Sequence, residues 1–364
     1  MKIIKNPWRG TGLKAEKIKA AGDVRADPSG VFALLSHCPA AVISPLVNCE
    51  KLAADLGIAR LVVKDERARM GLGSFKALGA AYAIAKRAHQ RLGDRLFAPG
   101  VAKTALTGEV FVAATAGNHG MSIAAGAKVF GARAVIYIAQ TVPESFAERL
   151  RVFGAEVVRE GAEYEASLAA AQTAAEKNGW QLLSDTSWPG YTELPLDVME
   201  GYLAMAAEAA KELEAQNWRP SHVFLQAGVG GLAAAVCAHL RARWGDGPVI
   251  VVVEPDAAPA LQASIEAGKP VITTGPVSNM GRLDCKEPSH LALKCLAKGA
   301  DYFQTVSDAY VQKAISDLAY AGLATSPSGG AGYAGLKAAL ANGQAGVNAD
   351  SRVLLFLSEG PTDA

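Results

Sequence analysis

Short apolar runs alternate with long alanine-rich segments along most of this chain, and this alternation constrains its fold more than any other feature. The predicted strands are 61–64, 110–114, 134–138, 156–159, 223–226, 249–254 and 353–357. The predicted helices are 74–91, 118–130, 144–153, 164–178, 196–216, 231–244, 258–267, 308–321 and 330–341. Because the strands are apolar throughout, both faces of their sheets should be buried. The pattern therefore predicts an α/β fold of mostly parallel sheets covered by helices on both sides.

Residues at the ends of some predicted helices support these boundaries. Gly131 and Gly154 lie where two helices should stop, because glycine readily adopts the left-handed conformation that closes a helix. Thr141 and Glu144 have the spacing of a capping box at the start of the helix 144–153.

The domain organisation follows from where the strand–helix units fall. Residues 77–180 contain their own series of strands and helices, so we predict a small domain there. Residues 1–76 and 181–364 would form a large domain, with the N-terminal segment returning to join it. Ligands in such folds bind beyond the carboxyl ends of the strands, where the motif loops described below lie.

The charge balance and the cysteines exclude several classes of function. The 364 residues carry 36 Lys and Arg against 35 Asp and Glu, so nothing favours nucleic acid or an anionic membrane surface as a partner. No apolar run is long enough to span a bilayer, and the first one is too short for a secretory signal. The five cysteines include no C-x-x-C pair, which favours free thiols in a reducing cytoplasm over a zinc site. We therefore expect a cytoplasmic protein without a metal centre.

The most informative local motif is the run 71–79, Gly-Leu-Gly-Ser-Phe-Lys-Ala-Leu-Gly. It places Lys76 just inside a predicted helix start, behind two glycines and a serine cap. Because a helix N-terminus carries partial positive charge, that position disfavours a second cation and favours a neutral amine. A neutral amine attacks aldehydes, so Lys76 is a candidate nucleophile.

A glycine-rich loop at residues 227–231, Ala-Gly-Val-Gly-Gly, connects the predicted strand 223–226 to a helix. Backbone amides in such a turn form an anion site together with the helix N-terminus. Gly228-x-Gly230-x-x-Ala233 also fits a dinucleotide fingerprint, and Glu254 ends the next strand where a ribose-binding acid would lie. Tight structural packing is the third interpretation. The loop alone does not separate a nicotinamide cofactor from pyridoxal 5′-phosphate (PLP), but together with a reactive lysine it favours PLP.

The loop 115–120, Thr-Ala-Gly-Asn-His-Gly, follows the predicted strand 110–114 and opens a helix. The Thr115 hydroxyl group and the amides there can hold a carboxylate, and Asn118 can donate to an aromatic oxygen such as the 3′-oxygen of PLP. A well-capped helix start is the alternative, since Thr, Asn and Gly all suit that position. We interpret the loop as functional, because a cap requires only one of these residues. His119 is interpreted first as a packing residue and second as a base.

Several motifs spread over nearly the whole chain resemble those of a known family. They are Lys64-Asp65-Glu66-x-x-Arg69, the run 71–79, Ser184-Asp185-Thr186-x-Trp188-x-Gly190-Tyr191, Met199-Glu200-Gly201-Tyr202, the run 226–231, Met280-Gly281-x-Leu283-x-Cys285-x-Glu287-Pro288 and Ser358-Glu359-Gly360-x-Thr362-Asp363. The chain resembles the fold-type II PLP enzymes, a group that includes threonine dehydratase, serine racemase and tryptophan synthase β. Within that group it most resembles the diaminopropionate ammonia-lyases. The motifs that begin at Ser184 and Met280 are the ones specific to the lyase.

The resemblance implies a set of site residues, with PLP in the cleft between the two domains of a homodimer. Lys76 would bind PLP covalently and later carry protons. Asp185 would be the acid/base carboxylate, although its turn-like neighbours also suit a strand-end cap. Asn118 would contact the ring oxygen of PLP, and the Ser358 hydroxyl group would meet the pyridine nitrogen and leave it uncharged. The phosphate would bind at Gly228, Val229, Gly230 and Gly231, and the amino-acid substrate would bind at Ser74, Thr115, Ala116, Gly117 and His119.

One residue departs from the pattern of the lyase family. That family usually carries an Asp where this chain has Ala116, and it uses two carboxylates to accept both enantiomers of 2,3-diaminopropionate. A methyl group neither abstracts a proton nor pairs with an ammonium group. Our first hypothesis is that activity on the D-enantiomer is lost, and our second is a different β-substituted amino acid as substrate.

The expected function is α,β-elimination from 2,3-diaminopropionate or a closely related β-substituted amino acid, which yields pyruvate and ammonia. Dehydration of a hydroxy amino acid such as threonine or serine, or racemisation, is the alternative on the same scaffold. A nicotinamide-dependent dehydrogenase, or a binding protein without catalysis that uses the glycine loop, is the third class.

Overall fold

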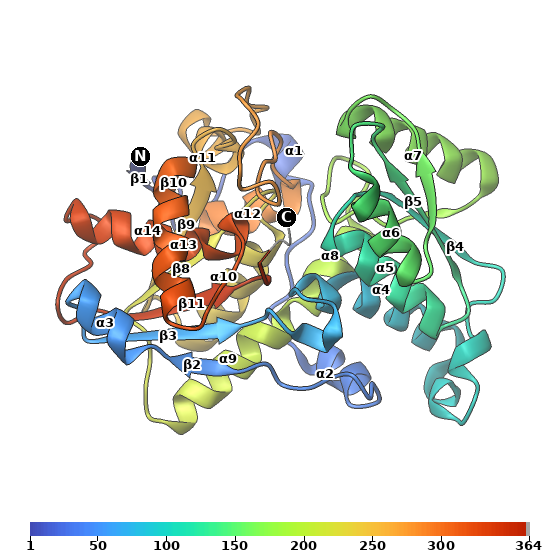
Figure 1. Ribbon diagram of the computed structural model, residues 1–364, viewed down its shortest axis with the longest axis horizontal. Coiled ribbons are helices and arrows are strands. Elements are labelled where there is room, and N and C mark those ends of the chain that lie inside the picture. The colour runs from blue at the N-terminus through green and yellow to red at the C-terminus, as the bar shows by residue number, and fades with distance from the viewer. Residues whose placement is uncertain (362–364) are drawn as a thin grey trace.

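Two β-sheets organise the chain, and they lie in different parts of the molecule (Figure 1). The structure is a computed structural model that describes residues 1–361. Thr362 and Asp363, which end one of the family motifs, lie outside the described residues. No helix in the described part of the chain is both long and apolar enough to cross a membrane.

The larger sheet has seven strands. In spatial order they are β1 (Ile3–Lys5), β10 (Tyr302–Val306), β9 (Val249–Pro255), β8 (His222–Gln226), β11 (Arg352–Leu357), β3 (Arg60–Asp65) and β2 (Leu46–Asn48). The five central strands run parallel, and the short edge strands β1 and β2 pair antiparallel. The register places Leu354 of β11 between Val62 of β3 and Val223 of β8. The mostly parallel α/β fold predicted from the continuous apolar runs is confirmed.

The smaller sheet has four parallel strands. Their order is β6 (Glu156–Arg159), β5 (Arg133–Ile138), β4 (Val110–Ala114) and β7 (Gln181–Leu182). β7 begins one residue beyond the proposed limit of the small domain at residue 180. The division of the chain into the segment 77–180 and the remainder stays a prediction, which the two separate sheets support.

Helices pack on both faces of each sheet. They are α1 (Glu16–Lys19), α2 (Ser29–Leu35), α3 (Glu50–Leu56), α4 (Lys76–Leu92), α5 (Asn118–Val129), α6 (Glu144–Val152), α7 (Tyr164–Asn178), α8 (Glu193–Gly201), α9 (Leu203–Ala215), α10 (Gly231–Trp244), α11 (Ala260–Ala267), α12 (His290–Gly299), α13 (Asp308–Tyr320) and α14 (Pro327–Ala341), with short 3₁₀ turns η1 (Arg69–Gly71), η2 (Gly93–Phe97) and η3 (Ala102–Thr104). Successive residues of β8 point to opposite faces of the sheet and pack in different hydrophobic clusters. Val223 and Leu225 pack in the cluster that contains α10, and Phe224 packs in the cluster that contains α14.

Two local predictions are wrong. The expected helix 196–216 is two helices, α8 and α9, which meet at Tyr202. A Cβ atom on Gly201 would lie 2.2 Å from the carbonyl oxygen of Leu78, so this junction is a point of close approach to α4. The expected capping box also fails: the Thr141 hydroxyl group donates to the carbonyl oxygen of Ala162, and α6 has no side-chain cap. The helix stops at Gly131 and Gly154 are confirmed by their positive φ angles of 72° and 98°.

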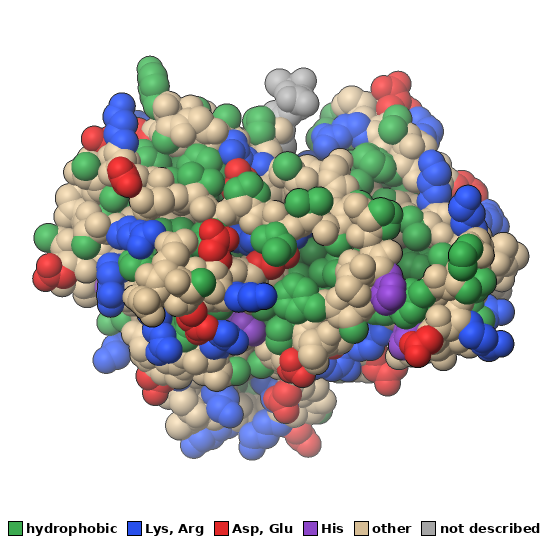
Figure 2. Space-filling view, turned by 90° about the horizontal axis from the view of Figure 1, so that it is seen from below, with side chains coloured by type: hydrophobic (Ala, Val, Ile, Leu, Met, Phe, Trp, Pro, Cys, Tyr) green, Lys and Arg blue, Asp and Glu red, His purple; other side chains and the backbone are tan. Residues whose placement is uncertain are grey.

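The molecular surface carries charges of both signs. On the face shown in Figure 2, acidic and basic side chains are interspersed and neither sign forms a large field of its own. This distribution agrees with the net charge of +1.

Candidate active site

The site lies where the carboxyl ends of the strands in the two sheets come together. In the larger sheet, β3, β11 and β8 are neighbours, so the loops that carry Lys76, Ser358 and the glycine run 228–231 emerge side by side. In the smaller sheet, β4 and β7 are neighbours, and the loops that carry Asn118 and Asp185 follow them. Two side-chain contacts join the edges, one between Lys76 and Asp185 and one between Asn118 and Glu359. The topology thus gathers predicted site residues from five loops.

A buried network of charges supports the loop between β3 and α4. Glu208 binds the ammonium group of Lys64 at 2.7 Å and the guanidinium group of Arg69 at 2.6 Å. Arg69 also pairs with Glu66 at 2.7 Å, and the side chains of Lys64 and Glu66 are fully buried. Buried charges are tolerated when each has a partner, so this network holds the loop without an unpaired charge. The next residue, Met70, has a positive φ of 51°, a conformation that surrounding structure must enforce.

Lys76 is the first residue of α4, and its side chain reaches the carboxylate of Asp185. Its backbone amide donates to the Ser74 hydroxyl group at 3.2 Å, but the N-cap residue of α4 is Phe75 and not the expected serine. The expected neutral amine is not found. Burial opposes a charge on the amine, but the Asp185 carboxylate offsets burial and raises the pKa of Lys76 above its ordinary value. The helix N-terminus alone would have acted in the opposite direction, and a non-local carboxylate outweighs it.

Asp185 is held charged by the same pair. Burial alone would raise the pKa of the Asp185 carboxyl, but the Lys76 ammonium group lowers it below its usual range. The two side chains are 22% and 23% exposed, so both remain open to a bound molecule. An amine and a carboxylate that are in contact and partly exposed can exchange a proton with the same substrate atom or with adjacent atoms.

The glycine loop forms a cradle for an anion. The amides of Gly228, Gly230 and Gly231 donate no hydrogen bond to any described residue, and α10 begins at Gly231. Gly230 has a φ of 101°, and a Cβ atom on Gly228 would lie 2.9 Å from Sγ of Cys285. Backbone amides without protein acceptors at the start of a 14-residue helix suit a phosphate group. The residues present therefore fit the phosphate of PLP.

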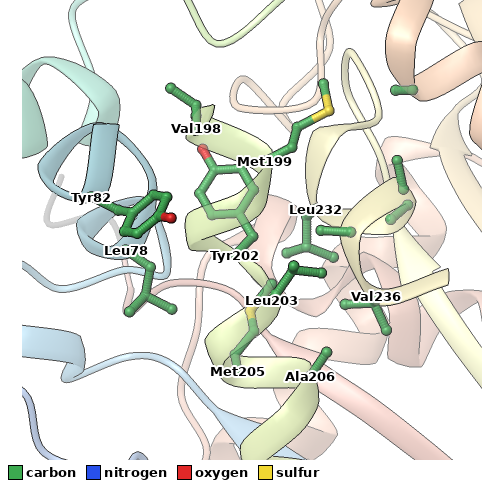
Figure 3. Packing of buried hydrophobic residues seen from close by; sticks show 14 of the residues in the cluster. Leu78, Tyr82, Val198, Met199, Tyr202, Leu203, Met205, Ala206, Leu232 and Val236 are labelled. Carbon is green, nitrogen blue, oxygen red and sulfur yellow. The ribbon is translucent and has the colours of Figure 1, made fainter. Parts of the chain in front are cut away.

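Tyr202 connects this cradle to the lysine. Its ring packs between Leu78 and Tyr82 of α4 on one side and Leu232 of α10 on the other (Figure 3). The Lys76 ammonium group lies 5.6 Å from the ring centroid, and a Cβ atom on Gly231 would touch the ring at 3.6 Å. Burial raises the pKa of Tyr202 to about 12. The ring of Tyr202 is thus neutral and lies between Lys76 and the glycine loop.

The asparagine loop lies across from Lys76. Thr115 accepts a hydrogen bond from the Gly117 amide at 3.2 Å, and Ala116 packs its methyl group against the core. The Asn118 side-chain amide donates to Glu359, whose other oxygen accepts from the Ser326 hydroxyl group. The contact of Asn118 with a PLP ring oxygen stays a prediction. Ser358, which precedes Glu359, is buried at the end of β11, and its carbonyl oxygen accepts from the Phe75 amide at 2.9 Å.

His119 occupies a packing position. Its ring donates from Nε2 to the carbonyl oxygen of Leu183 at 2.8 Å, and burial lowers the pKa of the ring. This bond ties α5 to the segment that leads into Asp185. A neutral ring that is used to join two elements fits the first interpretation of this residue better than the role of a base, and its place in substrate binding stays a prediction.

Glu254 caps a helix and does not face a ligand site. Both carboxylate oxygens accept amide hydrogens at the start of α11, from Leu261 at 2.7 Å and from Gln262 at 2.8 Å. Burial raises the pKa of Glu254 to about 8. The acid that favoured a dinucleotide site is thus engaged in the core, which removes the main support for the nicotinamide alternative.

Three residues without a role in the sequence analysis lie in this site. Tyr202 and Glu359 belong to motifs of the lyase family, which was the available signal for them. Arg282 stands at a variable position of the motif that begins at Met280, so nothing in the pattern marks it.

A lysine at a helix start, a carboxylate that faces it and a phosphate cradle at the edge of a parallel sheet define a fold-type II PLP-dependent enzyme. The family described as "Pyridoxal-phosphate dependent enzyme" matches residues 39–359 of the chain. Over 295 residues the chain is 34% identical to a diaminopropionate ammonia-lyase of Salmonella typhimurium, a match that covers 78% of this chain and 73% of that relative. Over 337 residues it is 31% identical to the Escherichia coli diaminopropionate ammonia-lyase, covering 88% of this chain and 85% of the relative.

A solved structure agrees with these sequence matches. The crystal structure of the Escherichia coli lyase in complex with an aminoacrylate–PLP azomethine reaction intermediate has a TM-score of 0.87 and 27% identity to this chain. That match covers 99% of this chain and 93% of the other. The chain belongs to the PLP-dependent enzyme family and, within it, to the family of the diaminopropionate ammonia-lyases. PLP is therefore its cofactor.

Proposed function

We propose that the protein is a PLP-dependent ammonia-lyase that converts 2,3-diaminopropionate, or a closely related β-substituted amino acid, to pyruvate and ammonia. The observation that carries this proposal is the partly exposed ion pair of Lys76 and Asp185. Loss of a β-amino group requires removal of the α-proton and protonation of the departing nitrogen. An amine and a carboxylate side by side supply both functions.

In this proposal, different residues of the site hold the cofactor, bind the substrate and transfer protons. PLP, when bound, supplies the electron sink that stabilises negative charge at the substrate α-carbon. The amides of residues 228–231 hold the phosphate, Asn118 and Ser358 orient the ring, and Ser74 and the 115–119 loop hold the substrate. The proton of the resting Lys76 ammonium group would pass to Asp185, so that the Lys76 amine accepts the α-proton and the Asp185 carboxyl group gives its proton to the leaving nitrogen. Tyr202 excludes water beneath the amine.

The departure at Ala116 leads to a proposal on stereochemistry. Because Ala116 replaces the second acid/base carboxylate of the family, the face of the α-carbon away from Lys76 has no proton acceptor, so the enzyme should act on L-2,3-diaminopropionate and not on the D-enantiomer. Steady-state release of pyruvate and ammonia from each pure enantiomer tests both levels of the proposal. Turnover of the L-form alone is expected. Equal rates would contradict the stereochemical proposal, and no release from either form would contradict the ammonia-lyase.

Dehydration of a hydroxy amino acid is the second candidate, and Ala116 is also the observation that favours it. A methyl group beside the substrate does not repel a hydroxyl group, whereas it offers nothing to a β-ammonium group. L-Serine and L-threonine in the same assay separate the two candidates. A higher kcat/KM with either hydroxy amino acid than with diaminopropionate would favour the dehydratase.

We also propose that the protein is a cytoplasmic homodimer. Its five cysteines, Cys38, Cys49, Cys237, Cys285 and Cys295, are free thiols in the structure, as a reducing compartment requires. Val42 and Ile43 are 72% and 67% exposed next to each other, which suits burial against a second subunit. The mass in solution, measured by light scattering, tests the dimer: a mass of one chain at micromolar concentration would contradict it.

A further inference from the structure

Arg282 reaches from the larger-sheet side of the molecule to the smaller-sheet side. Its backbone amide donates to the Ser328 hydroxyl group at 3.1 Å, which anchors the loop before α12 to the start of α14. Its guanidinium carbon lies 5.6 Å from the ring centroid of Phe146, on α6. A cation over an aromatic face is held electrostatically, so the side chain has a defined position over the site.

The guanidinium group lies over Gly117 of the asparagine loop. A Cβ atom on Gly117 would be 3.4 Å from Nε of Arg282 and 3.5 Å from its guanidinium carbon. The side chain therefore lies about one methyl group away from the backbone where a carboxylate would bind. A Cβ atom at position 117 would make ordinary van der Waals contact with the arginine, so the guanidinium group lies close over this part of the loop.

Nε of Arg282 is a buried donor without an acceptor among the described residues. The carboxylate of Glu359 lies 3.7 Å away, beyond the range of a hydrogen bond. The two oxygens of Glu359 already accept hydrogen bonds from Ser326 and Asn118. A buried, unused donor is unfavourable, and a planar guanidinium group is well suited to a bidentate carboxylate.

We propose that Arg282 binds a carboxylate group of the amino-acid substrate against the loop 115–118. This inference rests on the proposed function only in that the site accepts an amino acid. Arg282 also has a second effect there: its charge offsets that of Glu359, which otherwise would repel a carboxylate bound beside Asn118. The carboxylate has two possible sources, the α-carboxylate that every amino acid carries or a second carboxylate on the β-carbon.

Ligand titrations of the holoenzyme, followed by the visible absorbance of the cofactor, test the proposal. L-Alanine is compared with L-alaninamide for the α-carboxylate, and L-aspartate with L-asparagine for the second one. The variants are Arg282→Gln and Arg282→Lys. The control is Arg133→Gln, since Arg133 lies at the amino end of β5 with a side chain 61% exposed.

Arg282→Gln should weaken binding of every ligand that carries the bound carboxylate by about tenfold or more, and binding of a ligand without it by less than about twofold. If Arg282 binds the α-carboxylate, binding of L-alanine, L-aspartate and L-asparagine weakens and binding of L-alaninamide does not. If Arg282 binds a β-carboxylate, only binding of L-aspartate weakens. Arg282→Lys should recover part of the loss, because it keeps the charge but not the bidentate geometry. The control should bind like the wild type.

Equal weakening of acid and amide in both pairs would overturn the proposal, because a purely structural arginine predicts that result. Unchanged binding of all four ligands would overturn it as well. The titrations require no turnover. Absence of ammonia release would therefore contradict the proposed function while leaving the role of Arg282 open to this measurement.

Discussion

Lys76 and Asp185 form an ion pair although 109 positions separate them and they follow strands of different sheets. Burial disfavours the charged form of both residues, and for each residue the charge of its partner is the main influence that opposes this effect. The carboxylate raises the pKa of the lysine, and the ammonium group lowers the pKa of the aspartic acid. Without the charge of Lys76, burial would be the dominant influence on Asp185 and would raise its pKa. The ion pair thus keeps Asp185 ionised in the resting site, and loss of the pair would allow its carboxyl group to hold a proton.

Lys76→Ala should remove turnover and keep the phosphate cradle intact. Activity should fall at least about 10²–10⁴-fold, the contribution of general acid–base catalysis alone. PLP should still bind at the amides of residues 228–231, which equilibrium dialysis measures. Lys128→Ala, at an exposed position of α5, is the matched control and should retain activity. A K76A enzyme with more than about a tenth of wild-type activity would contradict the role of the lysine.

Asp185→Asn should slow elimination by about 10²–10⁴-fold while leaving PLP affinity nearly unchanged. An amide keeps the shape of the side chain but neither accepts nor delivers the proton. Rapid-quench measurement of pyruvate formation reports the rate, and Asp94→Asn at a 98% exposed position is the control. A wild-type rate in Asp185→Asn would remove this residue from the mechanism.

Gly230→Val should weaken PLP binding more than it destabilises the fold. The position has a φ of 101°, and an added Cβ atom would meet Ala292 at 3.0 Å beside the cradle. Gly57→Val is the matched control, because its φ is 67° and nothing lies within 4 Å of the added atom. Both variants should lose about 1–2 kcal/mol of stability from backbone strain. Only Gly230→Val should lower PLP affinity; an equal affinity in the two variants would contradict the placement of the phosphate.

Glu254→Gln should change how stability depends on pH. The folded pKa of Glu254 is raised to about 8, so between its ordinary value and 8 the folded protein keeps a proton that the unfolded chain has lost. This contribution to stability is full at low pH and declines as the pH rises through 8. The Tm of Glu254→Gln should therefore rise relative to wild type from pH 5 to pH 8. Thermal melts measure these Tm values. If the Tm of wild type and of Glu254→Gln changed with pH in parallel, Glu254 would not titrate in this range.

The apolar periodicity of the chain predicted the buried strands, because continuous runs such as 223–226 have few alternatives to a parallel sheet. The strands β1, β2 and β7 have two or three residues each, and only their pairing with neighbours defines them. The same limit explains the helix 196–216. Its break at Tyr202 depends on how closely α8 approaches α4, which no local pattern records.

The candidate site divides in the same way. The loops that carry Lys76, Asn118 and the glycine run follow predicted strands, so their meeting at the sheet edges was expected. The charge state of Lys76 was not, because a carboxylate from the other sheet reverses the local effect of the helix. Arg282 lies in an irregular loop, and its proximity to Gly117 arises only in the folded molecule.

The measurement that tests the central claim most directly is borohydride reduction of the PLP-loaded protein, followed by proteolysis and mass spectrometry. The claim is that the amine of Lys76 captures the aldehyde of a coenzyme anchored at residues 228–231. We predict visible absorbance that is lost on reduction and a pyridoxyl phosphate group on the peptide that contains Lys76. A colourless protein in excess PLP, or a label on another lysine with Lys76 unmodified, would contradict the account.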